Sequence, residues 1–126
     1  MFVLDSSVLI ETIKDGRRMH AVASLIPENE PLVTTTICMH EVLAGARTAQ
    51  ERLVFEGLFA KMHVFDHTVE AARAGARIEQ ELSHSGTLIN AHDILIAGVC
   101  KANNAELVTF DKDFARIKGI QAHILT

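Results

Sequence analysis

The sequence has no long apolar run and few cysteines. None of its apolar stretches approaches the roughly 18 residues that a membrane-spanning helix requires. The residues after Met1 lack the basic region, apolar segment and cleavage site of a signal peptide. Cys38 and Cys100 lie in apolar segments without a Cys or His partner at metal-binding spacing, which favours small core residues over a disulfide or a structural zinc site. We therefore expect a cytoplasmic protein with no membrane partner.

The chain also lacks an excess of positive charge. It carries 12 Lys and Arg residues against 16 Asp and Glu residues, which gives a formal net charge of −4. Because non-specific affinity for nucleic acids comes from basic side chains that neutralise phosphates, this balance argues at first against a nucleic-acid substrate. The balance does not reveal where in the fold the acids lie.

The length and the order of the expected elements indicate one α/β domain. A chain of 126 residues is long enough for a single core and too short for two domains. It contains no internal repeat, linker or low-complexity segment, so we expect one domain over residues 1–126. The alternation of strands and helices implies a parallel sheet of about five strands, covered by helices on both faces. Hydrophobic patterns predict strands at 1–4, 32–36, 63–65, 106–110 and 121–125, and helices at 6–14, 17–26, 37–46, 48–62, 69–82, 90–102 and 113–117.

Two acids stand directly after predicted strands. Asp5 follows the apolar run at the start of the chain, and Asp111 follows the strand predicted at 106–110. In open α/β sheets the ligand crevice lies outside the carboxyl ends of the strands, so both acids are candidate site residues. Each acid alone could instead cap the next helix, a common use of Asp, although we expect Ser6 or Ser7 to cap the first one.

Two further acids lie on apolar helices. Glu41 is the only formally charged residue of its predicted helix, and buried charges persist when they are paired or bind metal; the alternative is a solvated helix face. Asp93 stands in the first turn of its helix, where Asn90 and Asp93 resemble a capping box, so capping stays open as its role. His40 and His92 each adjoin one of these acids and could tune its protonation, although core or surface roles are common for His.

The four carboxylates come from four well-separated segments. If they meet, their negative charges repel one another, and a hard divalent cation is the natural compensation. Mg²⁺ prefers oxygen ligands and, in phosphate chemistry, is held by a few carboxylates together with the substrate phosphate. Such a cation can activate a water nucleophile and stabilise the leaving oxygen of an in-line displacement. The set of Asp5, Glu41, Asp93 and Asp111 therefore predicts phosphodiester hydrolysis.

Short motifs around these acids cover nearly the whole chain in a single order. With them the sequence resembles a PIN domain, and most closely the small VapC toxins of prokaryotic toxin–antitoxin pairs. Asn90 stands where a Gly is frequent in that family, and Gly98 where an Ala is usual. The motifs are Leu4-Asp5-Ser6-Ser7-Val8-Leu9-Ile10, His40-Glu41-Val42-Leu43-Ala44-Gly45, Gly86 through Asp93-Ile94-Leu95-Ile96-Ala97, and Leu107-Val108-Thr109-Phe110-Asp111-Lys112-Asp113-Phe114.

This resemblance implies a fold, an activity and partners. The fold is a PIN-like three-layer α/β/α domain, and the activity is that of a Mg²⁺- or Mn²⁺-dependent endoribonuclease that leaves 5′-phosphate and 3′-hydroxyl ends. The partners are the RNA substrate, a cognate VapB-type antitoxin whose tail covers the cleft, and a second copy of the toxin. The implied site residues are Asp5, Glu41, Asp93 and Asp111 as catalytic metal ligands, Ser6 and Thr109 as supporting hydroxyls, and Asp113 as a supporting or helix-starting residue.

Basic residues provide candidates for contacts with RNA. Lys112 and Arg116 lie beside the predicted site and are the better candidates for phosphate binding. Arg73 and Arg77, four residues apart, share a face of their helix. That face is either solvated, with neighbouring Glu residues as partners, or contacts RNA phosphate or the antitoxin.

Two other functions fit parts of the pattern. A signalling receiver is also a five-stranded α/β domain with an acidic Mg²⁺ pocket, and Asp66, after the strand at 63–65, would be its phosphoacceptor. Against this function, the chain has the single Asp5 where receivers have an acidic doublet, and no Lys follows the last strand. The second alternative is a catalytically idle PIN fold used for binding, which a structure with the acids splayed apart would favour.

The assignment of four acids to a metal site changes the meaning of the charge balance. Setting them aside leaves 12 acids against 12 bases, so the formal excess of −4 equals the predicted site. Local potential matters more than totals. With a cation bound, the chain is not acidic overall, and its balance no longer argues against an RNA substrate.

Overall fold

The described part of the chain contains five strands that form one parallel sheet. The structure, a computed structural model, describes residues 1–14, 16 and 18–126. In the sheet the strands lie in the order β3-β2-β1-β4-β5, and all four pairings are parallel. The predicted parallel sheet is therefore confirmed. The strands are β1 (Phe2–Leu4), β2 (Val33–Thr35), β3 (His63–Phe65), β4 (Glu106–Thr109) and β5 (Ala122–Ile124).

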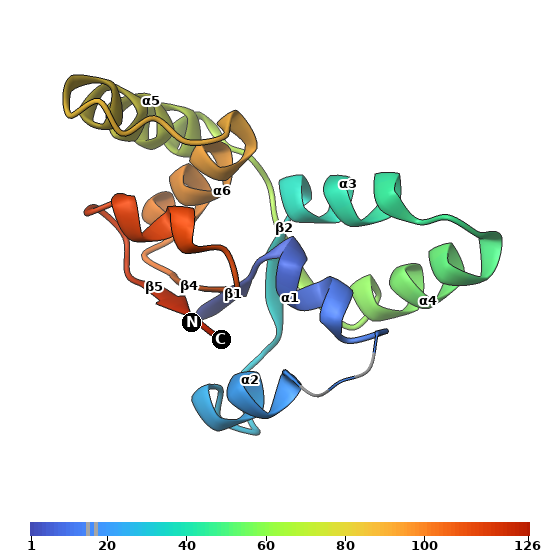
Figure 1. The fold of residues 1–126 in the computed structure, drawn as a ribbon. Coiled ribbons are helices and arrows are strands. Elements are labelled where there is room, and N and C mark those ends of the chain that lie inside the picture. Colours follow the sequence, from blue (N-terminus) through green and yellow to red (C-terminus); the bar gives the residue numbers. More distant parts are fainter. Residues whose placement is uncertain (15, 17) are drawn as a thin grey trace.

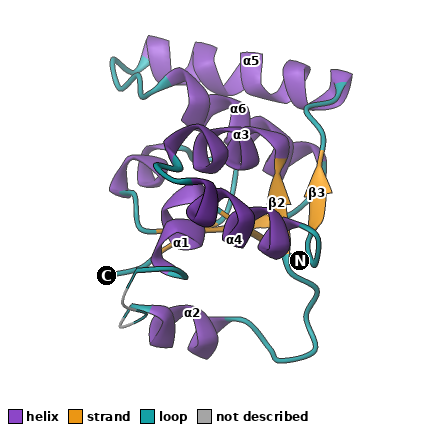
Figure 2. Cartoon of the chain, turned by 90° about the vertical axis from the view of Figure 1, so that its right-hand side faces the viewer, coloured by secondary structure: helices purple, strands orange, loops and turns teal. Residues whose placement is uncertain are grey.

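Helices cover both faces of this sheet. They are α1 (Ser6–Glu11), α2 (Met19–Leu25), α3 (Thr36–Gly45), α4 (Ala49–Phe59), α5 (Val69–His84), α6 (Ala91–Ala102) and the 3₁₀ helix η1 (Lys112–Arg116). In Figure 1, α3 and α4 lie to the right of the strands, and α5 and α6 lie above β4 and β5 at the upper left; Figure 2 shows α5 and α2 at opposite ends of the molecule. The strand order explains this division, because right-handed crossovers run one way from β1 to β3 and back the other way to β4. Among the described residues, no helix is long and apolar enough to cross a membrane.

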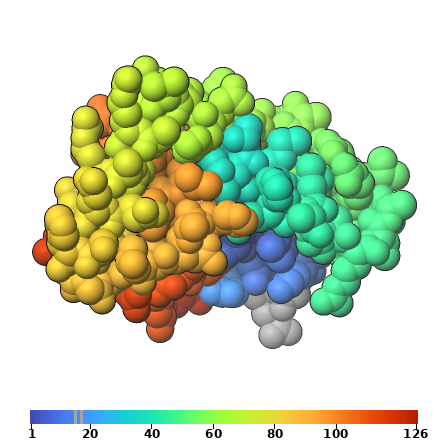
Figure 3. All heavy atoms as spheres, turned by 90° about the horizontal axis from the view of Figure 1, so that it is seen from above, coloured from blue at the N-terminus to red at the C-terminus, as the bar shows by residue number. Residues whose placement is uncertain are grey.

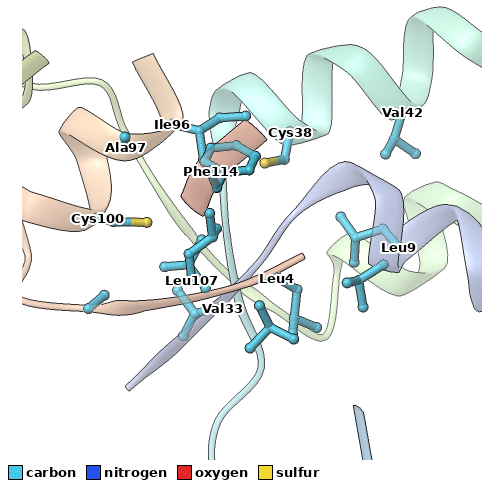
Figure 4. Close-up of a cluster of buried hydrophobic side chains, with 14 of the residues drawn as sticks. Leu4, Leu9, Val33, Cys38, Val42, Ile96, Ala97, Cys100, Leu107 and Phe114 are labelled. Atoms are coloured by element: carbon cyan, nitrogen blue, oxygen red, sulfur yellow. The ribbon is translucent and has the colours of Figure 1, made fainter. Parts of the chain in front are cut away.

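The hydrophobic core fixes the central strands. Val3 and Leu107, paired between β1 and β4, have no exposed surface. Figure 4 shows side chains of this core, among them Phe114 of η1, Cys38 of α3 and Cys100 of α6. Both cysteines are buried and free. Because burying a large apolar side chain stabilises the fold by about 1.5–3 kcal/mol, the ends of β1 and β4 are held firmly, together with the polar residues that follow them.

The helices α5 and α6 pack closely through two glycines. A Cβ atom added to Gly98 would lie 2.6 Å from the carbonyl oxygen of Ala71 and 3.0 Å from the backbone nitrogen of Gly75. These neighbours are backbone atoms, so no side-chain rotation can make room. At Gly75 the same addition meets nothing nearer than 3.6 Å, which is an ordinary van der Waals distance. Gly98, where the resembling family usually has Ala, is therefore required by the packing of this particular chain.

Several predicted helix ends need correction. The first helix ends at Glu11 and the fourth at Phe59, each three residues earlier than predicted, because the apolar residues that follow still pack on the core although the backbone has turned. The long Ala-rich helix instead continues two residues further, to His84. The second helix begins at Met19, and Arg17, its predicted first residue, lies outside the described residues. The other bounds agree with the prediction or differ by one or two residues, as is common at the ends of helices and strands.

Candidate metal centre

The four acids predicted from the sequence meet at the carboxyl ends of the central strands. Asp5 follows β1 and Asp111 lies just beyond β4; these parallel strands are neighbours, so their ends share one edge of the sheet. Glu41 on α3 and Asp93 in the first turn of α6 approach the same edge. Seen from above in Figure 3, α6 in orange and α3 in cyan lie side by side, with the blue N-terminal segment next to them.

Asp5 is the most buried of these acids, with 4% of its surface exposed. Its Oδ2 accepts hydrogen bonds from Thr109 Oγ1 at 2.7 Å and from Ser7 Oγ at 2.9 Å. Its Oδ1 accepts a weak hydrogen bond from Cys38 Sγ at 3.8 Å. The Ser7 hydroxyl in turn accepts a bond from the backbone N–H of Phe110 at 3.1 Å. The start of α1 and the end of β4 thus hold the Asp5 carboxylate in one orientation.

The two serines after Asp5 contact different acids of the centre. Ser6, the predicted supporting hydroxyl, donates to Glu41 Oε1 at 3.4 Å. Ser7, which the sequence reasoning did not select for the site, makes the shorter bond to Asp5. Neither serine caps α1: the N-cap residue is Asp5, and its side chain makes no capping bond because the oxygens are engaged by Ser7 and Thr109. The predicted cap was therefore wrong.

Glu41 adds a second carboxylate beside Asp5. The Glu41 side chain is half-buried rather than on a solvated face, and burial, followed by the negative charge of Asp5, raises its pKa. His92 opposes that rise, with Nδ1 3.7 Å from Glu41 Oε2. The His40 ring centroid lies 6.4 Å from that of His92. Three atoms form a first group: one carboxylate oxygen of Asp5, one of Glu41, and Cys38 Sγ. Each lies within 4.8 Å of the other two.

Asp93, Asp111 and Asp113 form a second group of carboxylates. One oxygen from each lies within 4.8 Å of the others. Asp111 also caps η1, because its Oδ1 accepts a bond from the backbone N–H of Asp113 at 2.9 Å; membership of the acidic group and capping are therefore compatible for this residue. Asp93 does not complete a capping box: the side chain of Asn90 caps α6 by accepting from the N–H of His92 at 2.8 Å. Its carboxylate is directed to the acidic group instead.

Two contacts link the groups of acids, and the pKa of Asp93 agrees with them. Thr109 Oγ1, which donates to Asp5, accepts a hydrogen bond from the backbone N–H of Asp111 at 3.0 Å, and His92, next to Asp93, places Nδ1 3.7 Å from Glu41 Oε2. Burial, followed by the negative charges of Asp111, Asp5, Glu41 and Asp113 in that order of importance, raises the pKa of Asp93 to about 7. Asp5 and Glu41 come from the other group, so their charges reach Asp93. The acids of both groups therefore converge.

The raised pKa of Asp93 predicts a pH-dependent stability in the presence of a chelator. Between pH 4 and 7 the folded chain binds more protons at Asp93 than the unfolded chain does, so the free energy of unfolding should fall as pH rises through that window. Allowing for solvent screening of a half-exposed group, we expect a fall of about 1 kcal/mol from this residue. Urea unfolding in EDTA at pH 5 and pH 7.5 measures it. The Asp93→Asn variant should lose this part of the fall, and an equal fall in both proteins would contradict the assignment.

The donor set of this centre suits a hard divalent cation. Its carboxylate oxygens are the ligands that Mg²⁺ and Mn²⁺ prefer. The Cys38 thiol is a different kind of group, because burial and the charge of Asp5 raise its pKa to about 12. Since the thiolate is the form that binds metals, Cys38 stays a protonated neighbour at neutral pH. The oxygens of Asp5, Glu41, Asp93 and Asp111 are the groups that could hold the metal.

The predicted basic residues all lie on the surface of the molecule. Lys112 is exposed at the start of η1. Arg116, at its end, places Nη2 3.8 Å from Asp113 Oδ1 and is half-exposed. Arg73 and Arg77 are both exposed on α5, and within the described part of the chain neither forms an ion pair. Arg116 is thus the predicted basic residue with a contact to the acidic centre.

The strand order contradicts the receiver alternative. In the receiver order β2-β1-β3-β4-β5, the third strand adjoins the first, which brings a phosphoacceptor after β3 next to acids after β1. Here β2 lies between β1 and β3. Asp66 is exposed after β3, two strands away from the strand that carries Asp5, and so does not share its pocket. A catalytically idle fold would be favoured by acids that lie far apart. The acids converge, so the structure does not favour that alternative.

Comparison with known proteins agrees with this architecture. The family model of the PIN domain matches residues 2–120. The chain is 35% identical over 124 residues to Ribonuclease VapC5 of Mycobacterium tuberculosis, covering 93% of this chain and 87% of that protein. The structure is similar to that of DNA-bound VapBC from Salmonella typhimurium, with a TM-score of 0.85, 27% identity and coverage of 98% and 96% of the two chains. It is also similar to VapBC-5, a toxin–antitoxin complex of Mycobacterium tuberculosis, with a TM-score of 0.74, 28% identity and coverage of 98% and 95%.

Proposed function

This chain belongs to the PIN domain family, and on that premise we propose that it is a metal-dependent endoribonuclease, the toxin of a toxin–antitoxin pair. The observation that carries the proposal is the convergence of carboxylates from four separate segments on one edge of the sheet. A 35% identical relative is named a ribonuclease, and similar solved structures are VapBC complexes, which supports the same function. The proposed domain spans residues 1–126.

We propose that Asp5, Glu41, Asp93 and Asp111 are catalytic and hold Mg²⁺ or Mn²⁺. When bound, such a cation stabilises negative charge on the phosphate and lowers the pKa of a water molecule. Hydrolysis of the phosphodiester bond then yields 5′-phosphate and 3′-hydroxyl ends. The raised pKa values of Glu41 and Asp93 reflect burial and crowded negative charge, which a cation would relieve.

The surrounding residues orient these ligands and the substrate. Thr109 and Ser7 fix Asp5 through hydrogen bonds of 2.7 and 2.9 Å, and Ser6 contacts Glu41 at 3.4 Å. Asp113 supports the site from the start of η1, within 4.8 Å of the oxygens of Asp93 and Asp111. The exposed Lys112 and Arg116 supply positive charge for RNA phosphates. These further site residues are Thr109, Ser7, Ser6, Asp113, Lys112 and Arg116.

The proposal includes partners and a compartment. By analogy with the similar VapBC structures, we propose a cognate VapB-type antitoxin as a partner. The family resemblance further implies that this antitoxin inhibits the toxin and that two copies of the chain form a homodimer. The activity takes place in the cytoplasm, where RNA is present and reducing conditions keep Cys38 and Cys100 as free thiols.

The test is RNA cleavage by the purified chain with and without metal. We expect cleavage in Mg²⁺ or Mn²⁺, none in EDTA, and recovery when excess metal is restored. The same cations should stabilise the fold by about 2.7 kcal/mol at a hundredfold excess over Kd, because they bind the folded acids and not the unfolded chain. Differential scanning calorimetry measures that gain.

Two controls separate this activity from effects of ionic strength and from unrelated toxicity. Ca²⁺ at the same concentration controls for ionic strength in the cleavage assay. In cells, growth arrest on expression should be relieved when the neighbouring gene is co-expressed, if that gene encodes the antitoxin. Cleavage that persists unchanged in EDTA would contradict the metal-dependent mechanism.

A further inference from the structure

A groove of about 490 Å³ lies next to the acidic centre, between the end of α5 and η1. Arg116 lines this groove and connects it to the centre, because its Nη2 lies 3.8 Å from Asp113 Oδ1. Its Nη1 donates to the backbone carbonyl of Leu88 at 3.4 Å, on the segment between α5 and α6. The Arg116 side chain lies between the acids and the groove, so an RNA strand bound at the acids can extend past it into the groove.

The groove offers both an apolar surface and positive charge. Ile78, Leu82 and Ile117 form its buried apolar part. Arg116 and Lys118, both exposed, lie along it on the η1 side. A nucleobase has an apolar face that stacks on such a surface, and the neighbouring phosphate pairs with basic side chains. This combination fits a nucleotide better than it fits a purely apolar segment.

The opposite side of the groove carries hydrogen-bonding groups. Ser85 Oγ and Thr87 Oγ1 lie 2.7 Å apart, and Ser85 Oγ also donates to the backbone carbonyl of Glu81 at 3.1 Å. The Glu81 side chain lines the groove as well and places one negative charge there. A ribose 2′-hydroxyl both donates and accepts hydrogen bonds, so it can bond to hydroxyls and to a carboxylate alike. These groups suit the sugar edge of RNA, while the phosphate faces the basic side.

We infer that this groove binds the nucleotide next to the scissile phosphodiester of single-stranded RNA. Its base lies over Ile78, Leu82 and Ile117, and its phosphate pairs with Arg116 and Lys118. The inference rests on the proposed ribonuclease function and assigns a substrate subsite to it. Lys118 is the sharper probe of the two basic residues, because Arg116 also contacts Asp113 of the acidic centre.

The test compares Lys118→Ala with the matched variant Lys101→Ala. Lys101 is an exposed residue of α6 in a different pocket, near the amino end of β4. The probe is a pool of randomised single-stranded RNA dodecamers that carry a fluorophore and a quencher. At 0.1 M KCl we expect Lys118→Ala to raise KM about fivefold with kcat within about twofold of wild type, and Lys101→Ala to change neither.

The salt dependence of kcat/KM distinguishes a phosphate contact from a purely structural role, because only the loss of a phosphate contact changes it. The slope of log(kcat/KM) against log[KCl] should decrease in magnitude by about 0.7 in Lys118→Ala, the value for one lost phosphate contact with a single strand. In a second experiment, the same pool with 4-thiouridine is cross-linked to the wild-type chain by ultraviolet light. The cross-links should map to the peptides that contain 78–87 and 115–118.

The outcomes separate this inference from the proposed function. If the wild-type chain neither cleaves nor cross-links the pool, the ribonuclease function fails, and the subsite falls with it. If the wild type cleaves but Lys118→Ala and Lys101→Ala have the same KM and salt slope, the subsite is overturned and the function stands. A Lys118→Ala variant that binds the antitoxin more weakly, with unchanged RNA kinetics, would make the groove an antitoxin site and overturn the RNA assignment.

Discussion

Replacing Asp5 with Asn is expected to reduce RNA cleavage by about 1,000-fold, the effect of losing several kcal/mol of transition-state stabilisation at a metal site. Asn is nearly isosteric with Asp but carries no charge, so it weakens the hold on a divalent cation. Asp5 is also the acid that Thr109, Ser7 and Cys38 all orient, so other residues of the centre do not replace it easily. The measurement is kcat/KM on the RNA pool at saturating Mn²⁺.

The matched control for this experiment is Asp66→Asn. It makes the same chemical change at an exposed residue after β3, away from the acidic centre, and should leave kcat/KM unchanged. Circular dichroism of both variants checks that the fold is intact. Full activity of a folded Asp5→Asn protein would overturn the proposed site, whereas an equal loss of activity in Asp66→Asn would show that the effect is not specific to the acidic centre.

Replacing Gly98 with Ala is expected to lower the free energy of unfolding by about 2 kcal/mol, within the range for overpacked cores. The new Cβ would lie 2.6 Å from the carbonyl oxygen of Ala71 and 3.0 Å from the backbone nitrogen of Gly75, so α5 and α6 must separate. For a domain of this size the Tm should fall by about 8 °C. Urea and thermal unfolding measure the change.

Gly75→Ala is the control, because it adds the same methyl group on the facing helix. The nearest atom to its Cβ would be the carbonyl oxygen of Ile94 at 3.6 Å, so the methyl group fits. Since Ala is favoured over Gly within a helix by about 1 kcal/mol, the Gly75→Ala variant should be as stable as the wild type or more stable. Equal losses in both variants would show that the close contact is not confined to Gly98.

The acids of the candidate site could be predicted where the neighbouring residues in the sequence distinguish them. Asp5 and Asp111 follow short apolar strands, and Glu41 stands alone in an apolar helix, so residue type and position select them. Ser7 was not predictable in this way, because two adjacent serines follow Asp5 and the sequence does not show which one turns back to it. The backbone at the start of α1 decides that Ser7 contacts Asp5 and Ser6 contacts Glu41.

The same limit applies to features made by two distant segments. The groove beside Arg116 is lined by the end of α5 and by η1, which lies about thirty residues later in the chain. The need for Gly at position 98 comes from the backbone of α5, not from the sequence of α6. In isolation, Gly98 is only an unfavourable residue in a helix.

The sequence by itself determined the class of fold and predicted the kind of chemistry. Alternating apolar strands and amphipathic or apolar helices require a covered parallel sheet, because only that arrangement buries strands that are apolar on both faces. Carboxylates that follow strands and lie on buried helices predict a bound cation, because their negative charges repel one another when they meet. Only the tertiary structure decided which strands are neighbours, and with that the site itself: Asp5 and Thr109, bonded at 2.7 Å, are 104 residues apart. Strand pairing joins residues that are distant in the sequence, so no local pattern specifies it. The order β3-β2-β1-β4-β5 brings the acids together and places Asp66 away from them.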